Sequence, residues 1–310
     1  MNAANQSAPV LDRRAWAELV LLSVLWGGSF FFIGAALREL PPLTVVTVRV
    51  ALGAVTLLPF VRVLGGTLPK TPAGWLPFFV MGMLNNVIPF SLLVFGQMFL
   101  SSGLASVLNA TTPLFTVLVL SAFGDERLTA RRVIGVLIGL AGVVVLRGPG
   151  LQTGYNQTLG MLLCLAAAAS YGFSGLWGRR KLAGIAPVTS AACQLVCSSF
   201  VMLIVTAAIE RPWQLPMPGT ATMLALIGLA TLATALAYIV FFDILSRSGA
   251  TNVMLVTLLI PVTAILLGTL VLGEPLTWRE IAGAIIIGSA LLVIDGRAIA
   301  WFGRRAPARV

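Results

Sequence analysis

The sequence predicts an all-α integral membrane protein of ten transmembrane helices, arranged as two five-helix repeats of opposite orientation. Three observations predict this: a composition too apolar for a water-exposed surface, ten apolar runs of spanning length, and a set of residues that recurs in the second half of the chain. Of the 310 residues, 58% are apolar and 10% are charged, and the mean hydropathy is +1.00. Lipid must therefore be the main solvent of this chain.

The ten apolar runs have lengths near the roughly 20 residues that cross a hydrocarbon core. We expect the first five spans at Trp16 to Leu37, Leu43 to Leu64, Trp75 to Phe99, Gly103 to Phe123 and Arg131 to Arg147, and the second five at Thr158 to Gly178, Pro187 to Ile209, Gly219 to Phe242, Ala250 to Leu272 and Trp278 to Gly296. Because lipid offers no hydrogen-bond partner to the backbone, runs of this length must be helices. Turn residues such as Gly65-Gly66 and Gly148-Pro149-Gly150 stand where helices should stop.

The distribution of basic residues predicts the orientation of the spans. Of the twenty Lys and Arg residues, fifteen fall in the N-terminal segment and the alternate connections that share its side, and four fall on the other side. By the positive-inside rule, both termini are expected in the cytoplasm of a multi-pass protein of the bacterial inner membrane. This topology also explains the net charge of +10, so we expect lipid and a small molecule as partners and no nucleic acid.

The two halves of the chain repeat each other. The segment Glu126-Arg-Leu-Thr-Ala-Arg matches Glu274-Pro-Leu-Thr-Trp-Arg at an offset of 148, and nearer the start an offset of 145 relates Pro42 to Pro187 and Thr44 to Thr189. We call residues related by these offsets repeat mates. Because each repeat, residues 1–148 and 149–310, has an odd number of spans, the second must be inverted. Inverted repeats are the architecture of secondary transporters, whose substrate site lies between the repeats near the midplane.

An ordered set of residues carries a family resemblance over essentially the whole chain. It comprises Leu25-Trp26-Gly27 with Ser29-Phe30, Arg49 after Pro42, and two blocks that run through Pro113, Glu126, Thr129 and Gly135 and through Pro261, Glu274, Thr277 and Gly283. This set resembles the EamA-domain proteins of the drug/metabolite transporter superfamily, most of all the YddG-type exporters of aromatic amino acids. The resemblance implies a ten-helix metabolite exporter or facilitator. The second repeat departs from it, with Tyr171 as the mate of Trp26 and Gln194 as the mate of Arg49.

Three prolines, Pro89, Pro113 and Pro261, fall near the middle of predicted spans. A proline within a helix frees the carbonyl four residues earlier, which here belongs to Asn85, Asn109 or Thr257. Our hypothesis is that these carbonyls, with the amides of Asn85, Asn86 and Asn109, contact a zwitterionic or polar substrate. The alternative is a set of packing kinks whose carbonyls bond to Ser, Thr or water.

Two pairs of aromatic repeat mates form the second part of the predicted site. Trp26 pairs with Tyr171, and Phe90 with Tyr238. Such rings can stack on an aromatic substrate and attract an ammonium group, although packing or an interfacial belt is the other interpretation. The expected substrate-binding set is therefore Trp26, Asn85, Asn86, Phe90, Asn109, Tyr171, Tyr238 and Thr257.

Arg49 is the only basic residue clearly inside a span, about 9 Å from the outer end of its helix. Such a buried charge favours a substrate or gating role, with a substrate carboxylate as the partner. The alternative interpretation is that Arg49 snorkels to the outer interface or caps a neighbouring helix. The chain has no His and no acidic residue near the middle of a predicted span, so we expect no proton relay, which favours a facilitator.

The remaining motifs indicate structural roles. Thr277 and Glu280 have the spacing of a capping box, and Glu126 and Glu274 precede helix starts. The cysteines Cys164, Cys193 and Cys197 show no metal-ligand or disulfide spacing, and no phosphate loop or nucleophile elbow occurs. We therefore expect no cofactor, no metal and no catalytic residue. Small-residue faces leave open whether copies of the chain pack together or it acts as a monomer.

Three classes of function remain: a solute carrier, a membrane-embedded enzyme, and a sensor or scaffold. The duplication, the prolines and the polar amides favour the carrier, whereas an enzyme would need a nucleophile with a base or a metal set in the bilayer. Within carriers we expect export or facilitated transport of aromatic and other neutral amino acids by alternating access. Other small metabolites and drug-like cations are the alternative cargoes.

Overall fold

The computed structural model describes residues 13–126, 128–147, 155–253 and 255–295, and these form helices and no strands. The helices are α1 (Arg13–Ala36), α2 (Pro42–Val63), α3 (Pro72–Gly82), the π-helix η1 (Met83–Val87), α4 (Ile88–Gln97), α5 (Ser102–Asn109), α6 (Thr112–Ala122), α7 (Ala130–Arg147), α8 (Tyr155–Lys181), α9 (Pro187–Ile209), the short 3₁₀ turn η2 (Pro212–Gln214), α10 (Thr220–Ala230), the π-helix η3 (Thr231–Leu236), α11 (Ala237–Val253), α12 (Val256–Val271) and α13 (Trp278–Asp295). The Gly148–Gly150 turn, both chain termini and the basic residues Arg127, Arg297, Arg304, Arg305 and Arg309 lie outside the described residues.

The described part of the chain forms ten helical rods. Helix α3 runs through η1 into α4, and α10 runs through η3 into α11, so each of these sets is one rod. Helices α5 and α6 also share one rod. Seven of the rods are long and apolar enough to span a membrane. Two of the others, α7 and α13, contain three charged residues each at their ends, and α12 has only sixteen residues. The all-α membrane fold predicted from composition is confirmed.

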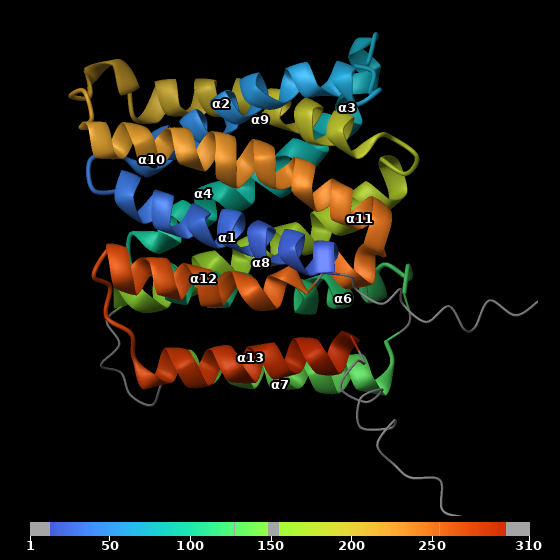
Figure 1. Ribbon diagram of the computed structural model, residues 1–310, viewed down its shortest axis with the longest axis vertical. Coiled ribbons are helices and arrows are strands. Elements are labelled where there is room, and N and C mark those ends of the chain that lie inside the picture. The colour runs from blue at the N-terminus through green and yellow to red at the C-terminus, as the bar shows by residue number, and fades with distance from the viewer. Residues whose placement is uncertain (1–12, 127, 148–154, 254, 296–310) are drawn as a thin grey trace, which may run out of the picture.

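The rods lie nearly parallel and form a layered bundle. In Figure 1 they run horizontally, with α2 and α9 at one edge, α1 and α8 in the middle, and α7 and α13 at the opposite edge. At each edge the two neighbours are equivalent helices of the two repeats, and both pairs are in contact. The contact of α1 with α12 is likewise matched by that of α8 with α5 and α6. This pattern is what a pseudo-two-fold axis between inverted repeats produces.

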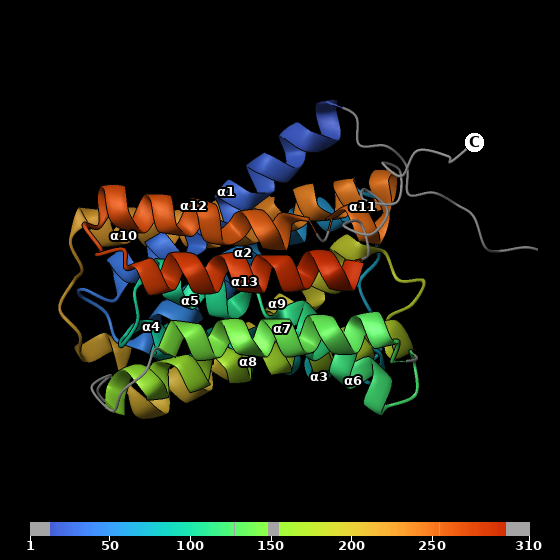
Figure 2. The ribbon, with the colours of Figure 1, turned by 90° about the horizontal axis from the view of Figure 1, so that it is seen from below.

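Helices α7 and α13 form a pair at one edge of the bundle (Figure 1), and they lie side by side in front of the other rods in Figure 2. A Cβ at Gly135 would lie 2.4 Å from the Cγ1 of Ile294, and one at Gly283 would lie 2.4 Å from the Cδ2 of Leu146. The Ala290 carbonyl oxygen would lie 3.1 Å from the first Cβ and the Gly142 carbonyl oxygen 3.2 Å from the second, so glycine lets the two backbones approach closely. A Cβ at Gly139 would lie 2.2 Å from the Cδ1 of Leu114, so the predicted small-residue face of Gly135 and Gly139 packs within the chain.

The described helices depart from the expected spans in two places. The span expected from Gly103 to Phe123 is broken between Asn109 and Thr112, where Pro113 is the second residue of α6. The span expected from Gly219 to Phe242 does not end there, because α11 continues to Val253. In the first repeat, the capping serine Ser101 precedes the start of α5. Its repeat mate is Gly249, which has no side chain to cap a helix, and α11 runs on past this position.

Candidate functional site

A cluster of polar side chains lies in the interior of the bundle around Asn85 on η1. The Asn85 Nδ2 donates to Gln194 Oε1 at 3.0 Å and to the Tyr238 hydroxyl at 3.2 Å. Its Oδ1 accepts from the Ser174 hydroxyl at 3.2 Å. Asn85 thus joins three helices, α8, α9 and α11, across both repeats. These three bonds use most of the hydrogen-bonding capacity of this half-buried amide.

The neighbouring Asn86 is fully buried and extends the cluster. Its Nδ2 donates to the Ser198 hydroxyl at 3.1 Å, and its Oδ1 accepts from the Tyr238 hydroxyl at 3.5 Å. Tyr238 therefore bonds to both asparagines of η1. Both amides bond to α9 and α11, so one widened turn positions both of them against the second repeat.

Arg49 points into the bundle and does not reach the interface. It is 6% exposed, and its Nε donates to the Thr234 hydroxyl at 3.1 Å. Its guanidinium lies over the ring of Phe90, with Cζ 3.7 Å from the centroid, which is a cation–π contact. The snorkelling interpretation is therefore wrong for this conformation. The reason is that Thr234 and Phe90 offer partners inside the bundle, close to Arg49.

In the described part of the chain every ion pair is formed by other residues, so the charge of Arg49 has no anionic counterpart there. Tyr171 and Tyr238 lie within electrostatic range of the guanidinium. A guanidinium carries five N–H donors that match a carboxylate in bidentate geometry. The chemistry of Arg49 therefore suits a carboxylate as its partner.

The π-helices shape this cluster, and they are repeat mates, since Met83 and Thr231 are 148 residues apart. A π turn leaves carbonyls without their usual helical partner. The Leu84 carbonyl accepts from the Ser170 hydroxyl at 2.7 Å, and the Leu229 carbonyl accepts from the Thr234 hydroxyl at 2.8 Å. Hydroxyl groups thus satisfy the carbonyls, which matches the packing interpretation of the helix irregularities.

The cluster follows the repeat symmetry in its positions and breaks it in its chemistry. Arg49 on α2 contacts Thr234 on η3, and the mate of Arg49, Gln194 on α9, contacts Asn85 on η1. Asn86 is the repeat mate of Thr234. The contact of α2 with η3 therefore carries the cation Arg49. The equivalent contact of α9 with η1 carries the amide Gln194.

An aromatic chain links Trp26 to the cluster. The Trp26 ring lies 5.3 Å from that of Phe241, which packs edge-on at 5.2 Å against Phe242. Phe242 in turn stacks on Tyr238 at 5.9 Å. Tyr171 packs against both large apolar cores of the bundle. The four predicted aromatic residues therefore surround one region of the interior, although Trp26 reaches it only through other rings.

Asn109 and Thr257 lie away from this cluster. Thr257 and Pro261 line an apolar cavity of about 180 Å³ between α5, α12 and α13. The Asn109 carbonyl, expected to be free, accepts from the Thr112 hydroxyl at 2.7 Å. Pro89 directly follows η1, and Pro113 stands at the break between α5 and α6. Of the three prolines, Pro89 is the one next to the asparagine cluster.

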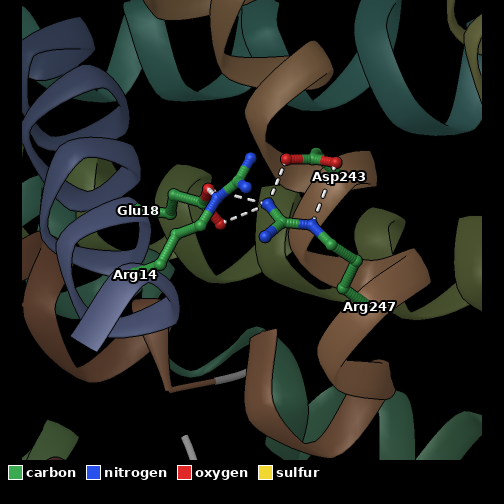
Figure 3. A network of polar contacts seen from close by, with 4 residues as sticks. All are labelled: Arg14, Glu18, Asp243 and Arg247. Carbon is green, nitrogen blue, oxygen red and sulfur yellow. Dashed lines mark hydrogen bonds and ion pairs between the residues drawn. The ribbon is translucent and has the colours of Figure 1, made fainter. Parts of the chain in front are cut away.

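Ion pairs join the two repeats at the end of the bundle where α1 and α9 begin, which we call the basic end. Glu18 on α1 accepts from Arg247 on α11 at 2.6 and 2.7 Å and from Arg14 at 2.9 Å, and Arg247 also pairs with Asp243 (Figure 3). These side chains point toward one another across the gap between α1 and α11. The network closes this side of the basic end in the described conformation.

A second set of pairs at the basic end links α8 to the connection between α6 and α7. Arg180 Nε donates to Asp125 Oδ1 at 3.0 Å, and Arg179 pairs with Glu126 at 2.7 Å. The hydrogen bond from Arg180 holds the pKa of Asp125 below its usual range. The Asp125 carboxylate therefore stays ionised, and the pair stays intact, into mildly acidic conditions.

Carboxylates close the opposite end by capping helices of the other repeat. Glu210 accepts from the backbone N–H groups of Leu43 and Thr44, at 2.9 and 2.7 Å, and from the Thr44 hydroxyl at 2.8 Å. Glu274 accepts from the N–H and hydroxyl of Ser102, at 2.9 and 2.8 Å. The predicted capping box of Thr277 and Glu280 is confirmed by bonds of 2.9 and 3.3 Å. Glu274 thus has a structural role between repeats.

Comparison with known proteins identifies the family. The model of the EamA-like transporter family matches residues 15–148 and again 158–294. The chain belongs to the EamA-like transporter family. It is therefore a transporter, and its duplicated match agrees with the duplicated sequence. The resemblance to EamA-domain proteins is thus confirmed, while the closer likeness to YddG-type exporters stays a prediction.

Relatives of this EamA chain span nearly its whole length. An uncharacterized transporter of Archaeoglobus fulgidus is 28% identical over 288 residues, 90% of this chain and 99% of that protein. A probable amino-acid metabolite efflux pump of Salmonella typhimurium is 28% identical, over 91% of this chain and 95% of its own length. A solved crystal structure that covers 96% of this chain shares the fold, with a TM-score of 0.66 and 18% identity.

Proposed function

We propose that this EamA transporter moves aromatic and other neutral amino acids across the inner membrane by alternating access, with export as its direction. The observation that carries the proposal is the buried guanidinium of Arg49, which contacts Thr234 and Phe90 and pairs with no carboxylate of the described chain. A buried charge of this kind calls for a partner, and the carboxylate of an amino acid supplies one.

The rest of the cluster suits the other parts of such a cargo. Phe90 and Tyr238 offer ring faces to an aromatic side chain or an ammonium group, and the amide oxygens of Asn85 and Gln194 are further acceptors. Drug-like cations are a poorer match because Arg49 repels them. The name of the Salmonella relative, a probable amino-acid metabolite efflux pump, supports the same cargo class, and that of the Escherichia coli inner membrane transporter YedA supports the location.

The test is flux in proteoliposomes with labelled amino acids, sugars and a cationic dye, with and without a pH gradient. We expect amino-acid flux that Arg49→Gln lowers by about 10-fold or more, because hydrogen bonds to a charged group contribute about 1.5–3 kcal/mol. Val55→Ala, on an exposed position of the same helix, is the control and should transport normally. Amino-acid flux that Arg49→Gln leaves unchanged, in a folded variant, would contradict the assigned role of Arg49.

A further inference from the structure

The helices α2 and α9 are repeat mates and begin with the same three hydrogen-bond donors. In α2 these are the N–H groups of Leu43 and Thr44 and the Thr44 hydroxyl, and all three surround the carboxylate of Glu210. In α9 the equivalent donors belong to Val188 and Thr189. The Thr189 hydroxyl has no hydrogen-bond partner among the described residues, although Thr189 is only 3% exposed.

The residue that would supply the matching carboxylate is missing from the second copy of this arrangement. Helix α9 ends at Ile209, and its C-cap Glu210 is followed by Arg211 with φ 48°. Helix α2 ends in the same way at Val63, and its C-cap Leu64 is followed by Gly65 with φ 76°. Aligned at their C-caps, the two helices match Glu210 with Leu64, one residue away from the offset of 145 because α9 has 23 residues and α2 has 22. Leu64 is 52% exposed and carries no acceptor in its side chain. The donors are thus retained and the acceptor is absent.

We propose that the N-terminus of α9 is a carboxylate-binding site at the basic end of the bundle. The first turn of a helix carries unpaired N–H groups and a partial positive charge, which favours an anion. The buried Thr189 hydroxyl adds a donor that lacks an acceptor, and the matching turn of α2 holds a carboxylate on the equivalent donors. Arg62, in the last turn of α2, and Lys70 add positive charge to the same end.

The occupant is the carboxylate of the cargo as it enters from this end, and in that respect the inference rests on the proposed function. A turn of two glycines covers the site: a Cβ at Gly66 would lie 2.3 Å from the Thr189 hydroxyl oxygen, so the backbone lies directly against it. Gly65 has nothing within 4 Å of its Cβ position. A small shift of this turn exposes the Thr189 hydroxyl, while Glu210 keeps the equivalent site of α2 filled.

The first experiment fills the site from within the chain. Leu64→Glu places a carboxylate where Glu210 stands in the other copy, and Leu64→Gln is the matched uncharged control. We expect Leu64→Glu to melt at a higher temperature than Leu64→Gln and to slow hydrogen exchange in the first turns of α9. Equal melting temperatures and equal exchange in the two variants would overturn the proposal.

The second experiment adds the probe from solution, in the Arg49→Gln background so that the interior cation is absent. Potassium acetate, compared with potassium chloride at the same ionic strength, should slow exchange in the first turns of α9. Thr189→Val should remove this protection, Thr189→Ser should keep it, and Leu64→Glu should make it independent of acetate. Absence of acetate protection with Thr189 intact would refute the site.

Two further probes separate the site from the cargo. L-phenylalanine should give the same protection as acetate, whereas phenethylamine, which has no carboxylate, should give none. Protection by acetate but not by L-phenylalanine would keep the carboxylate site and refute an amino acid as its occupant. Protection by phenethylamine would overturn the carboxylate chemistry itself.

Discussion

At the scale of single residues, the interior of the bundle is organised by hydrogen bonds that cross between the repeats. Tyr238 is central, because its hydroxyl bonds to Asn85 and Asn86 while its ring stacks on Phe242. The hydroxyl thus binds the asparagines of η1, and the ring packs against Phe242. Their contributions can be separated by substitution.

Tyr238→Phe removes the hydroxyl and keeps the ring. One Asn85 N–H then loses its acceptor inside the bundle, at a cost of about 1–3 kcal/mol. We expect a lower melting temperature and an apparent cargo affinity reduced by roughly 10-fold, measured by thermal unfolding and by flux against cargo concentration.

Phe242→Leu is the companion variant, because it removes the ring stack and leaves both hydroxyl bonds in place. We expect this variant to keep its cargo affinity within about 2-fold, a difference below about 0.5 kcal/mol. A larger loss of affinity in Phe242→Leu than in Tyr238→Phe would assign the effect to ring stacking and contradict the hydroxyl's role.

The residues that the sequence could identify are those whose type is unusual inside a membrane helix. Arg49, Asn85 and Asn86 are polar at membrane depth, and the structure brings all three into one region. Their role in binding stays a prediction. Gln194 was visible only as the mate of Arg49, and the hydroxyls of Ser174 and Thr234 gave no signal, because serine and threonine commonly bond to their own helix.

At the scale of the elements, the two π-helices show where sequence pattern stops being informative. Pro89 follows η1 and explains a disturbed helix there, since it cannot donate to the carbonyl of Asn85. The equivalent position after η3 is Ala237, which carries no such signal. The π turn of the second repeat was therefore not predictable locally. A proline four residues later predicts a site role for Asn109 and Thr257 alike, but the Asn109 carbonyl bonds to the Thr112 hydroxyl and Thr257 lines the apolar cavity between α5, α12 and α13.

Helix capping across the repeats is the element-scale feature with the clearest energetic consequence. Glu210→Gln replaces a carboxylate that accepts three hydrogen bonds from Leu43 and Thr44 at the start of α2. We expect a loss of about 1–2 kcal/mol of stability, from the cap and from the helix dipole together. Thermal unfolding in detergent measures it.

Glu39→Gln is the matched control for this cap. Glu39 accepts one bond, from Gly219 at the start of α10, in an exposed setting. We therefore expect a smaller loss than for Glu210→Gln. A loss at Glu39 that equals or exceeds the one at Glu210 would show that the three-bond cap does not set the stability of this end.

At the scale of the whole molecule, the two ends of the bundle are closed by different chemistry. One end is held by carboxylates on backbone N–H groups, and the basic end is held by ion pairs between exposed or half-buried side chains. Ion pairs near water are individually weak, about 0–1 kcal/mol, and salt screens them. The basic end should therefore open more readily, and this difference favours the entry of cargo there.

This asymmetry yields a prediction for the network of Figure 3. Glu18→Gln removes the carboxylate that ties α1 to Arg247, whereas Arg14→Gln removes only a partner whose side chain is 69% exposed. We expect Glu18→Gln to speed hydrogen exchange in the first turns of α1 and around Arg247, and Arg14→Gln to leave it nearly unchanged. High salt should reproduce part of the Glu18→Gln effect in the wild-type protein, because screening weakens the same pairs. Exchange at the start of α2 should not respond, because Glu210 and not an ion pair holds that end; faster exchange at both ends would mean that the variant loosens the whole bundle.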